Sequence, residues 1–297
     1  MRPHILTERG PWLAYDMIRR LAELYPRAFV TGASAGLGRA FAGMLLGEGV
    51  RVWGTARDAA RLTDLAARHP ALFTPVVLDL ANPAAAEAAF ERAAKSAGGA
   101  FDLVINNAGY GVFGAFDATE FAVWQAQLDA MLGTTLRLAH TAQRGMRARN
   151  RGCLVNVSSL AAEFPLPFLS GYNVAKAGLS ALSESLIVET RGTGLSVIDF
   201  RPGDYRTGFN HAMSSASSSA PAASPAARRV WQHLEANLHA APPPVRAAAD
   251  LRRALLRGRS GTVRSGSFFQ ARLAPLFARL APASWRRAVA AKYFGSP

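Results

Sequence analysis

Cysteine and metal-binding histidine patterns are scarce in this sequence. The single cysteine among 297 residues, Cys153, excludes an intramolecular disulfide and any zinc site built from several cysteines. The six histidines show no HxxxH or HExxH spacing, so the sequence predicts no metal site.

Long apolar runs are scarce as well. Residues 1–25 carry four arginines but no long apolar stretch followed by a small-residue cleavage site. The longest uncharged stretch, 207–227, is built mostly from Ser, Ala and Pro, which supply too little apolar bulk to span a bilayer. We therefore expect no signal peptide, no membrane-spanning helix and a cytoplasmic protein.

Acidic residues are few compared with basic residues. The sequence has 20 Asp and Glu and 34 Lys and Arg, which gives a net charge of +14. Most of this excess lies in residues 245–297, where ten arginines and Lys292 face Asp250 alone. Such a tail can meet an anionic membrane, an acidic protein or nucleic acid, or it can be a solvated basic face. No nucleic-acid recognition motif accompanies it, so we expect no nucleic-acid partner.

Half of the residues are hydrophobic and 18% are charged, as in a globular protein with a sizeable core. From residue 27 to about 203, short β-rich runs alternate with Ala- and Leu-rich stretches of helical length. This alternation predicts right-handed βαβ units and an α/β fold, a Rossmann-like doubly wound parallel sheet with helices on both faces. We expect strands near 27–30, 50–55, 75–80, 103–106, 153–157 and 196–200, and helices near 38–48, 83–97, 118–149 and 173–190.

Three parts are predicted along the chain. Residues 1–26 form an N-terminal helical extension, since apolar residues recur at helical spacing before Pro26. Residues 27–260 form a single domain, in which the segment 212–244 begins with a Ser-, Ala- and Pro-rich run typical of a mobile loop over a substrate site. Residues 261–297 form a basic amphipathic helical segment broken by two prolines.

The glycines of TGASAGLG (31–38) join the first predicted strand to a helix. Gly32, Gly36 and Gly38 let the backbone turn sharply and approach a pyrophosphate, while the helix N-terminus offers free N–H groups. The spacing differs from GxGxxG, and an ordinary strand-to-helix turn is the alternative.

The end of the second predicted strand indicates which dinucleotide such a turn would bind. An acidic residue there would bind the ribose 2′-hydroxyl of NAD, but the strand ends in Ala56 and Arg57. Arg57, with Arg39 as a second candidate cation, favours NADP(H) over NAD(H), because a guanidinium can meet the 2′-phosphate.

Tyr172 and Lys176 are four residues apart in a predicted helix, so both side chains project from one face. An ammonium beside a phenol lowers the pKa of the phenol, which makes Tyr172 a candidate general acid/base and Lys176 its tuning residue. Ser159 ends the preceding strand, and its hydroxyl can stabilise charge on a substrate carbonyl oxygen. Ser158 is the competing hydroxyl, and a cap is the alternative role of Ser159.

Together the motifs resemble the single-domain short-chain dehydrogenase/reductase family. The matching pieces occur in the family's order and spacing: TGASAGLG (31–38), LDL (78–80), NNAG (106–109), NVSS (156–159), YNVAK (172–176) and RPGDYRT (201–207). The resemblance implies a NAD(P)-dependent carbonyl reductase or alcohol dehydrogenase with Ser159, Tyr172 and Lys176 as catalytic residues. It also implies a homodimer or homotetramer.

The same resemblance, together with Arg57, assigns a set of cofactor contacts. Asp79 and Leu80 would border the adenine, and Pro202, Gly203 and Thr207 would hold the nicotinamide carboxamide. The full set is Gly32, Ser34, Gly36, Leu37, Gly38, Arg57, Asp79, Leu80, Asn106, Ala108, Gly109, Tyr172, Lys176, Pro202, Gly203 and Thr207.

One position departs from the family pattern. The fourth catalytic residue of the family is an asparagine that steadies a water in a proton relay through the lysine, and Met131 stands at its place here. A thioether accepts hydrogen bonds too weakly for that role. The alternative function is therefore a cofactor-binding protein with little catalysis, acting as a redox sensor or scaffold.

Apolar residues flank the predicted site. FPLPF (164–168) precedes Tyr172 and GYGVFG (109–114) lies opposite, as in family members that act on steroids, retinol and lipid ketones. We therefore expect NADPH-dependent hydride transfer between the nicotinamide and a lipophilic carbonyl or alcohol.

The C-terminal segment carries a further apolar stripe, formed by Phe268, Phe269, Leu273, Leu276, Phe277 and Leu280 with Arg272 and Arg279 beside it. This composition is typical of an interfacial segment and predicts peripheral membrane contact. Packing over the substrate pocket or against a dimer partner explains the stripe equally well.

Overall fold

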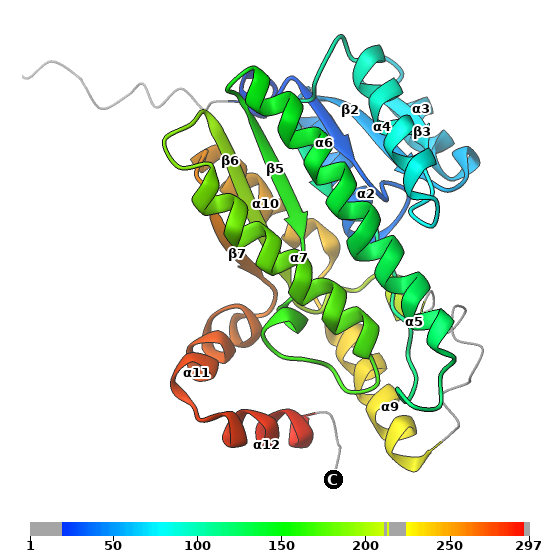
Figure 1. The fold of residues 1–297 in the computed structure, drawn as a ribbon, viewed down its shortest axis with the longest axis vertical. Helices are drawn as coiled ribbons and strands as arrows, with labels where there is room; N and C mark the ends of the chain where they lie inside the picture. Colours follow the sequence, from blue (N-terminus) through cyan, green and yellow to red (C-terminus); the bar gives the residue numbers. More distant parts are fainter. Residues whose placement is uncertain (1–19, 211–212, 214–223, 294–297) are drawn as a thin grey trace, which may run out of the picture.

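The computed structural model describes residues 20–210, 213 and 224–293 (Figure 1). Its centre is a seven-stranded sheet in the order β3-β2-β1-β4-β5-β6-β7, in which all neighbouring strands are parallel. The predicted α/β doubly wound fold is confirmed. The strands are β1 (Arg27–Val30), β2 (Arg51–Ala56), β3 (Phe73–Val77), β4 (Leu103–Asn106), β5 (Gly152–Val157), β6 (Leu195–Pro202) and β7 (Gly261–Ser265).

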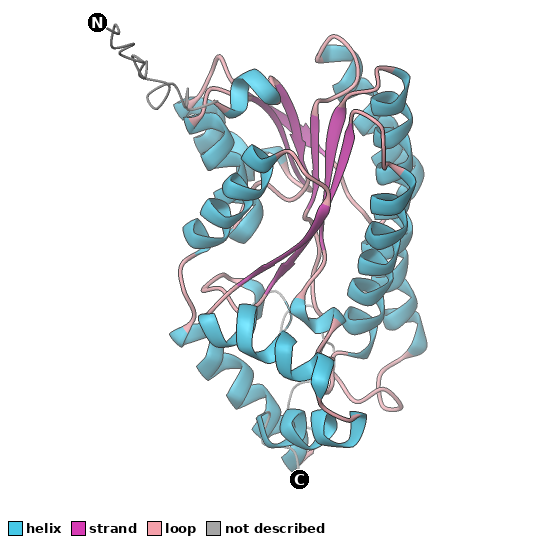
Figure 2. Cartoon of the chain, turned by 90° about the vertical axis from the view of Figure 1, so that its left-hand side faces the viewer, coloured by secondary structure: helices cyan, strands magenta, loops and turns pink. Residues whose placement is uncertain are grey.

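Helices cover both faces of this sheet (Figure 2). Alternation along the strands assigns each residue to a face. Val30 and Ile105 pack with α2 (Gly36–Gly47) and α10 (Pro244–Arg257), whereas Phe29 and Val104 pack with α4 (Pro83–Ser96), α6 (Thr135–Ala148) and α7 (Ser170–Glu189). Because both faces of the sheet are buried, the strands are continuous apolar runs in the sequence.

The remaining helices are short or lie at the ends of the sheet. They are α1 (Leu21–Leu24), η1 (Ala59–Leu62), α3 (Thr63–Arg68), α5 (Phe121–Leu128), the π-helical turn η2 (Asp129–Thr134), η3 (Leu160–Ala162), α9 (Pro225–Ala240), η4 (Phe269–Leu273), α11 (Ala274–Leu280) and α12 (Ala283–Tyr293). Within the described ranges, no helix combines the length and apolarity needed to cross a membrane.

The structure corrects the predicted boundary at residue 260. Residues 261–265 form β7, which pairs with β6 and completes the sheet, so the helical C-terminal segment begins only after this strand. In the predicted loop 212–244, the second half forms α9, whose Ser224 side chain caps its N-terminus by accepting from the Ala227 N–H. Most of the predicted N-terminal helix, residues 1–19, lies outside the described residues, as do 211–212 and 214–223.

The strand order reverses at β1, whose neighbours are β2 on one side and β4 on the other. In open α/β sheets, ligands bind beyond the carboxyl ends of the strands at such a reversal. Helices α9, α11 and α12 lie beyond this end of the sheet, in the lower half of Figure 1.

Candidate active site

A cavity of about 1230 Å³ opens at the carboxyl ends of the strands. Its walls come from the turn after β1, the ends of β2, β5 and β6, the start of α7 and the C-terminal helices. All three predicted catalytic residues lie on its wall. So do most of the predicted cofactor contacts: Gly32, Ser34, Gly36, Leu37, Arg57, Asp79, Leu80, Ala108, Gly109, Tyr172, Lys176, Pro202, Gly203 and Thr207.

The glycine turn has the conformation that the motif predicts. Gly32 and Gly36 adopt φ values of +70° and +54°, which favour glycine. Gly38 is not on the cavity wall; a Cβ there would lie 2.2 Å from the Gly32 carbonyl oxygen, so this glycine allows α2 to pack against the turn. Helix α2 has no acidic residue in its first turn and no side-chain cap at Ala35. Its first N–H groups are therefore free to bind an anion such as a pyrophosphate.

Asn106 is the second predicted contact that the structure removes from the wall. It is buried at the end of β4, where its Nδ2 donates to Asn156 Oδ1 at 3.0 Å. The neighbouring Asn107 lines the cavity instead and donates from Nδ2 to the Thr31 carbonyl at 2.9 Å. The N–H groups of Asn107 and Ala108 both donate to Thr31 Oγ1, which joins the turn after β4 to the turn after β1.

Two arginines lie at the end of the cavity formed by β2. Arg57 and Arg61 are both exposed and both line the wall; sequence reasoning missed Arg61, which is on η1. Arg39 does not line the cavity. Its guanidinium pairs with Asp64, to which Nη1 donates at 3.1 Å. The second arginine on this wall, beside Arg57, is therefore Arg61, whereas Arg39 lies off the wall in an ion pair.

Lys176 and Tyr172 project from one face of α7 into the cavity. The Lys176 Nζ donates to the Val157 carbonyl at 2.7 Å and lies 5.7 Å from the centroid of the Tyr172 ring. Burial lowers the pKa of Lys176 to about 8, a shift that the negative charge of Asp199 opposes. At neutral pH the side chain is mostly an ammonium.

Tyr172 does not have the lowered pKa that the sequence predicts. Burial raises the pKa of its phenol to about 12; a hydrogen bond with Ser159 opposes this shift, and the charge of Asp204 adds to it. The Lys176 ammonium is directed at the Val157 carbonyl, not at the phenol oxygen. Tyr172 is consequently a protonated phenol at neutral pH.

The two serines after β5 have different surroundings. Ser159 Oγ lies on the wall, bonds to Tyr172 and also caps η3 by accepting from the Ala161 N–H at 3.0 Å. Ser159 can therefore cap η3 and contact Tyr172 at the same time. Ser158, the competing hydroxyl, is fully buried and donates to the Asp199 carboxylate. Only Ser159 presents its hydroxyl to Tyr172.

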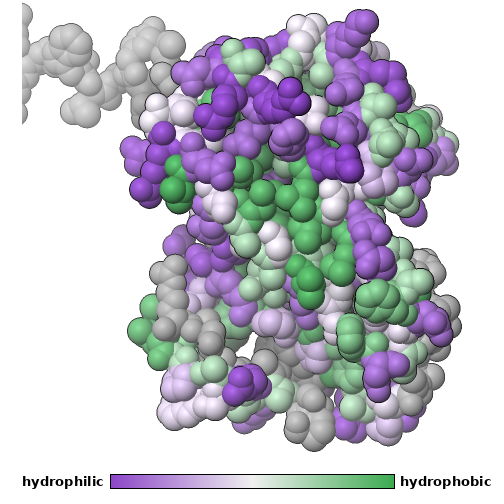
Figure 3. Space-filling model, in the orientation of Figure 1, coloured by the Kyte–Doolittle hydropathy of each residue, from purple (hydrophilic) through white to green (hydrophobic). Residues whose placement is uncertain are grey.

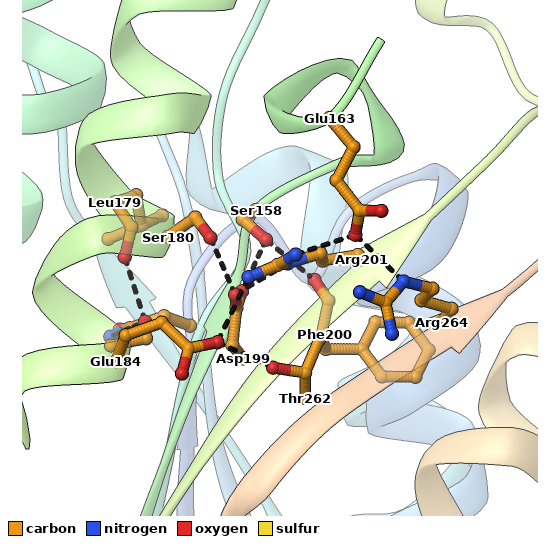
Figure 4. Close-up of polar contacts among 12 residues, drawn as sticks. Ser158, Glu163, Leu179, Ser180, Glu184, Asp199, Phe200, Arg201, Thr262 and Arg264 are labelled. Atoms are coloured by element: carbon orange, nitrogen blue, oxygen red, sulfur yellow. Dashed lines mark hydrogen bonds and ion pairs between the residues drawn. The ribbon is translucent and has the colours of Figure 1, made fainter. Parts of the chain in front are cut away.

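A buried polar network holds this edge of the site (Figure 4). At its centre the Asp199 carboxylate, on β6, accepts from Ser158, from Ser180 Oγ at 2.7 Å and from Arg201 Nε at 2.7 Å. Arg201 also pairs with Glu163 and Glu184, and Glu163 pairs with Arg264 on β7. The network links the end of β5, η3, α7, β6 and β7. It therefore holds the segment after β5, which carries Ser158 and Ser159, in place relative to α7.

Met131 lies in η2, buried behind the cavity wall. A Cβ added at Gly109 would come 3.0 Å from the Met131 Cε and 3.8 Å from the Lys176 Nζ, so both side chains lie close to Gly109. Thr134, three residues after Met131, donates its hydroxyl to the Leu80 carbonyl at 2.7 Å. Its hydroxyl is therefore already bonded to the backbone and does not replace the missing amide.

The part of the cavity beyond Tyr172 is mostly apolar. Its wall combines residues after β5 and before α7 with residues of α9, η4, α11 and α12: Phe164, Leu166, Leu169, Phe209, Met213, Leu234, Leu238, Phe269, Leu273, Phe277 and Val289. Asp204 and Gln270 are polar exceptions on this wall, and no motif in the sequence marks either of them.

Comparisons with known proteins agree with this geometry. The family model described as short chain dehydrogenase matches residues 26–218. The 3-ketodihydrosphingosine reductase of Bacteroides thetaiotaomicron is 31% identical over 181 residues, which cover 61% of this chain and 64% of that protein. A short-chain dehydrogenase structure from Streptomyces avermitilis has a TM-score of 0.76 at 28% identity, covering 90% of this chain and 98% of its own. A metagenomic short-chain oxidoreductase in complex with NADP has a TM-score of 0.62 at 28% identity, covering 80% and 96%.

Proposed function

The chain belongs to the short-chain dehydrogenase family of nicotinamide-dependent oxidoreductases, and we propose that it uses NADP(H) to interconvert a lipophilic carbonyl compound and its alcohol. One observation carries the proposal. Ser159, Tyr172 and Lys176 share one wall of a cavity whose far end holds two arginines and whose near end is apolar.

The residues at the strand ends fit a dinucleotide. The turn at Gly32 and Gly36 and the uncapped start of α2 would hold the pyrophosphate. Arg57 and Arg61 would meet a 2′-phosphate, which supports NADP(H) over NAD(H). Near the catalytic wall, the end of β6 and the backbone after it would hold the nicotinamide through Pro202, Gly203 and Thr207. The segment after β3 would border the adenine through Asp79 and Leu80.

Each catalytic side chain has a role that follows from its surroundings. A bound nicotinamide supplies the hydride for reduction. Tyr172, a phenol at neutral pH, donates its proton to the carbonyl oxygen, and Ser159 donates a hydrogen bond to the same oxygen. The Lys176 ammonium stabilises the phenolate that forms. Near pH 7 the protonated phenol is the form that can donate a proton during carbonyl reduction.

The test is NADPH oxidation with ketones that share one reacting group and differ in chain length. We expect kcat/KM to rise with chain length, because each buried methylene adds about 0.8 kcal/mol of binding. Rates that fall with chain length would contradict the lipophilic assignment. The alternative, a cofactor-binding protein with little catalysis, rests on Met131 alone and predicts NADPH binding without turnover of any ketone.

We also propose peripheral membrane contact through the C-terminal helices. Phe268, Leu280 and Trp285 are 73%, 78% and 65% exposed, and Arg272 and Arg287 are exposed nearby. Apolar side chains with neighbouring cations suit an anionic bilayer surface. Cosedimentation with phosphatidylserine vesicles should fall when Leu280 and Trp285 are both replaced by Asp. Equal recovery of wild type and this variant would rule the contact out.

A homodimer is proposed on a separate surface. Apolar surface lies over α6 and α7 in the middle of the face shown in Figure 3, and exposed apolar side chains on these helices include Leu136, Val174 and Val188. Light scattering should give twice the monomer mass for wild type and the monomer mass for Leu136→Asp. A monomeric wild type would refute the proposal.

A further inference from the structure

A single carboxylate interrupts the apolar part of the cavity. Asp204 follows Pro202 and Gly203 at the end of β6 and lies on the wall, on the same side as Tyr172. The two side chains are close enough for the charge of Asp204 to raise the pKa of the Tyr172 phenol. A negative charge therefore stands next to the reacting group.

Gln270 of η4 holds this carboxylate in place. Its Nε2 donates to Asp204 Oδ2 at 2.6 Å, and its Oε1 accepts from the Asp204 N–H at 3.4 Å. The bonded amide needs glycine beside it, since a Cβ at Gly203 would come 2.7 Å from the Gln270 Oε1. One carboxylate oxygen is thus fixed, and the side chain has a defined direction in the cavity.

The second oxygen, Oδ1, has no hydrogen-bond donor and the carboxylate has no ion pair among residues 20–210 and 224–293. The nearest ammonium on the wall, Lys176, is bonded to Val157. Burial raises the pKa of Asp204 above its ordinary value, as expected for a carboxylate that no cation compensates. A ligand cation would supply the missing partner and remove this cost.

We propose that Asp204 is a substrate-binding residue that selects lipophilic alcohols and ketones carrying an ammonium group close to the reacting carbon. The inference rests on the proposed function and names its substrate class: the apolar wall takes the hydrocarbon body, Tyr172 and Ser159 take the oxygen, and Asp204 Oδ1 accepts from the ammonium. The ion pair also offsets the negative charge that opposes phenolate formation at Tyr172.

The experiment compares three substrates of equal chain length in the oxidising direction with NADP+: 2-aminododecan-3-ol, dodecane-2,3-diol and dodecan-3-ol. Wild type should prefer the amino alcohol over dodecan-3-ol by about 30-fold in kcat/KM, which corresponds to roughly 2 kcal/mol for a charge-assisted hydrogen bond. The diol should gain much less, because its hydroxyl is a neutral donor.

Asp204→Asn keeps the acceptor for Gln270 and removes the charge. In this variant the preference should fall below about threefold, while NADP+ affinity stays close to wild type. Dodecan-3-ol oxidation should not fall, because the charge that opposes phenolate formation at Tyr172 is removed. Asp117→Asn, an exposed aspartate, is the matched control and should keep the full preference. An NADP+ affinity close to that of wild type shows that the variant is folded.

Three results would overturn the inference. They are a wild type that oxidises dodecan-3-ol without preferring the amine, a diol that is preferred as strongly as the amine, and an Asp204→Asn variant that retains the amine preference. Each leaves the proposed function intact. A wild type that binds NADP+ yet oxidises none of the three and reduces no ketone would instead defeat the proposed function, and this inference with it.

Discussion

The Lys176 Nζ lies 2.7 Å from the Val157 carbonyl oxygen, which ties α7 to the last residue of β5. The bond holds an ammonium 5.7 Å from the centre of the Tyr172 ring, without a direct bond to the phenol. We propose that Lys176 acts on Tyr172 through its charge, and burial makes that charge costly.

Lys176→Met should abolish turnover and change how stability depends on pH. The pKa of Lys176 falls from 10.5 to about 8 on folding, so between these values the folded protein holds fewer protons than the unfolded chain, and wild-type stability rises with pH. Below pH 8 the cost is nearly complete, roughly 3 kcal/mol. The stability of the variant relative to wild type should therefore fall by about that amount between pH 7 and pH 10.5 in urea unfolding. A constant difference would show that Lys176 is not destabilised by burial.

Cofactor choice should follow the two arginines beside β2. Arg57→Ala and Arg61→Ala should each weaken NADPH binding about 10–100-fold, because each loses a charge-assisted contact to the 2′-phosphate, and should leave NADH binding nearly unchanged. Arg39→Ala, whose guanidinium pairs with Asp64, is the control and should change neither affinity much. Equal losses of NADPH and NADH binding in the Arg57 and Arg61 variants would contradict the assignment.

Met131→Asn should raise multiple-turnover rates. NADPH affinity and the first turnover should stay unchanged, because the glycine turn and Tyr172 do not depend on this side chain. An amide beside Lys176 could hold the water through which the proton of Tyr172 is resupplied. The gain should be a small part of the roughly 10²–10⁴-fold that acid–base catalysis contributes. Met131→Leu is the control of similar volume. An Asn variant no faster than wild type would mean that protons already reach Tyr172 by another route.

The Asp199 network should contribute to stability. Asp199→Asn retains the shape but removes the charge that Arg201, Ser158 and Ser180 bond to. We expect a loss of about 2–4 kcal/mol in the free energy of unfolding, since the Arg201 guanidinium is buried beside it. Asp117→Asn should change stability by no more than about 0.5 kcal/mol. Urea unfolding that gives the same midpoint for both variants would contradict this role.

Local patterns were sufficient for most of the fold. The glycine turn could be placed because positive φ at Gly32 and Gly36 is a local requirement, and the placement of Tyr172 and Lys176 follows from helical spacing alone. The edge strand β7 escaped prediction because its five residues are only partly buried before Ser265 and carry Arg264, so no apolar run marks it.

Contacts between distant segments could not be predicted. The Asp204–Gln270 pair joins residues 66 positions apart, and the choice between Arg39 and Arg61 depends on where Asp64 folds. The pKa of Tyr172 likewise depends on burial and on Asp204, neither of which the spacing to Lys176 reveals. Residue types and their spacing predicted the catalytic groups, whereas contacts between distant segments determine the direction of the Tyr172 pKa shift.

The proposed function requires Tyr172 to supply the proton for carbonyl reduction. The direct test is steady-state NADPH oxidation with a long-chain ketone, measured for wild type and Tyr172→Phe at matched cofactor saturation. We expect a loss of about 10²–10⁴-fold in kcat with NADPH affinity nearly unchanged, because only the hydroxyl is removed. A phenylalanine variant that retains more than a tenth of the wild-type kcat would contradict it.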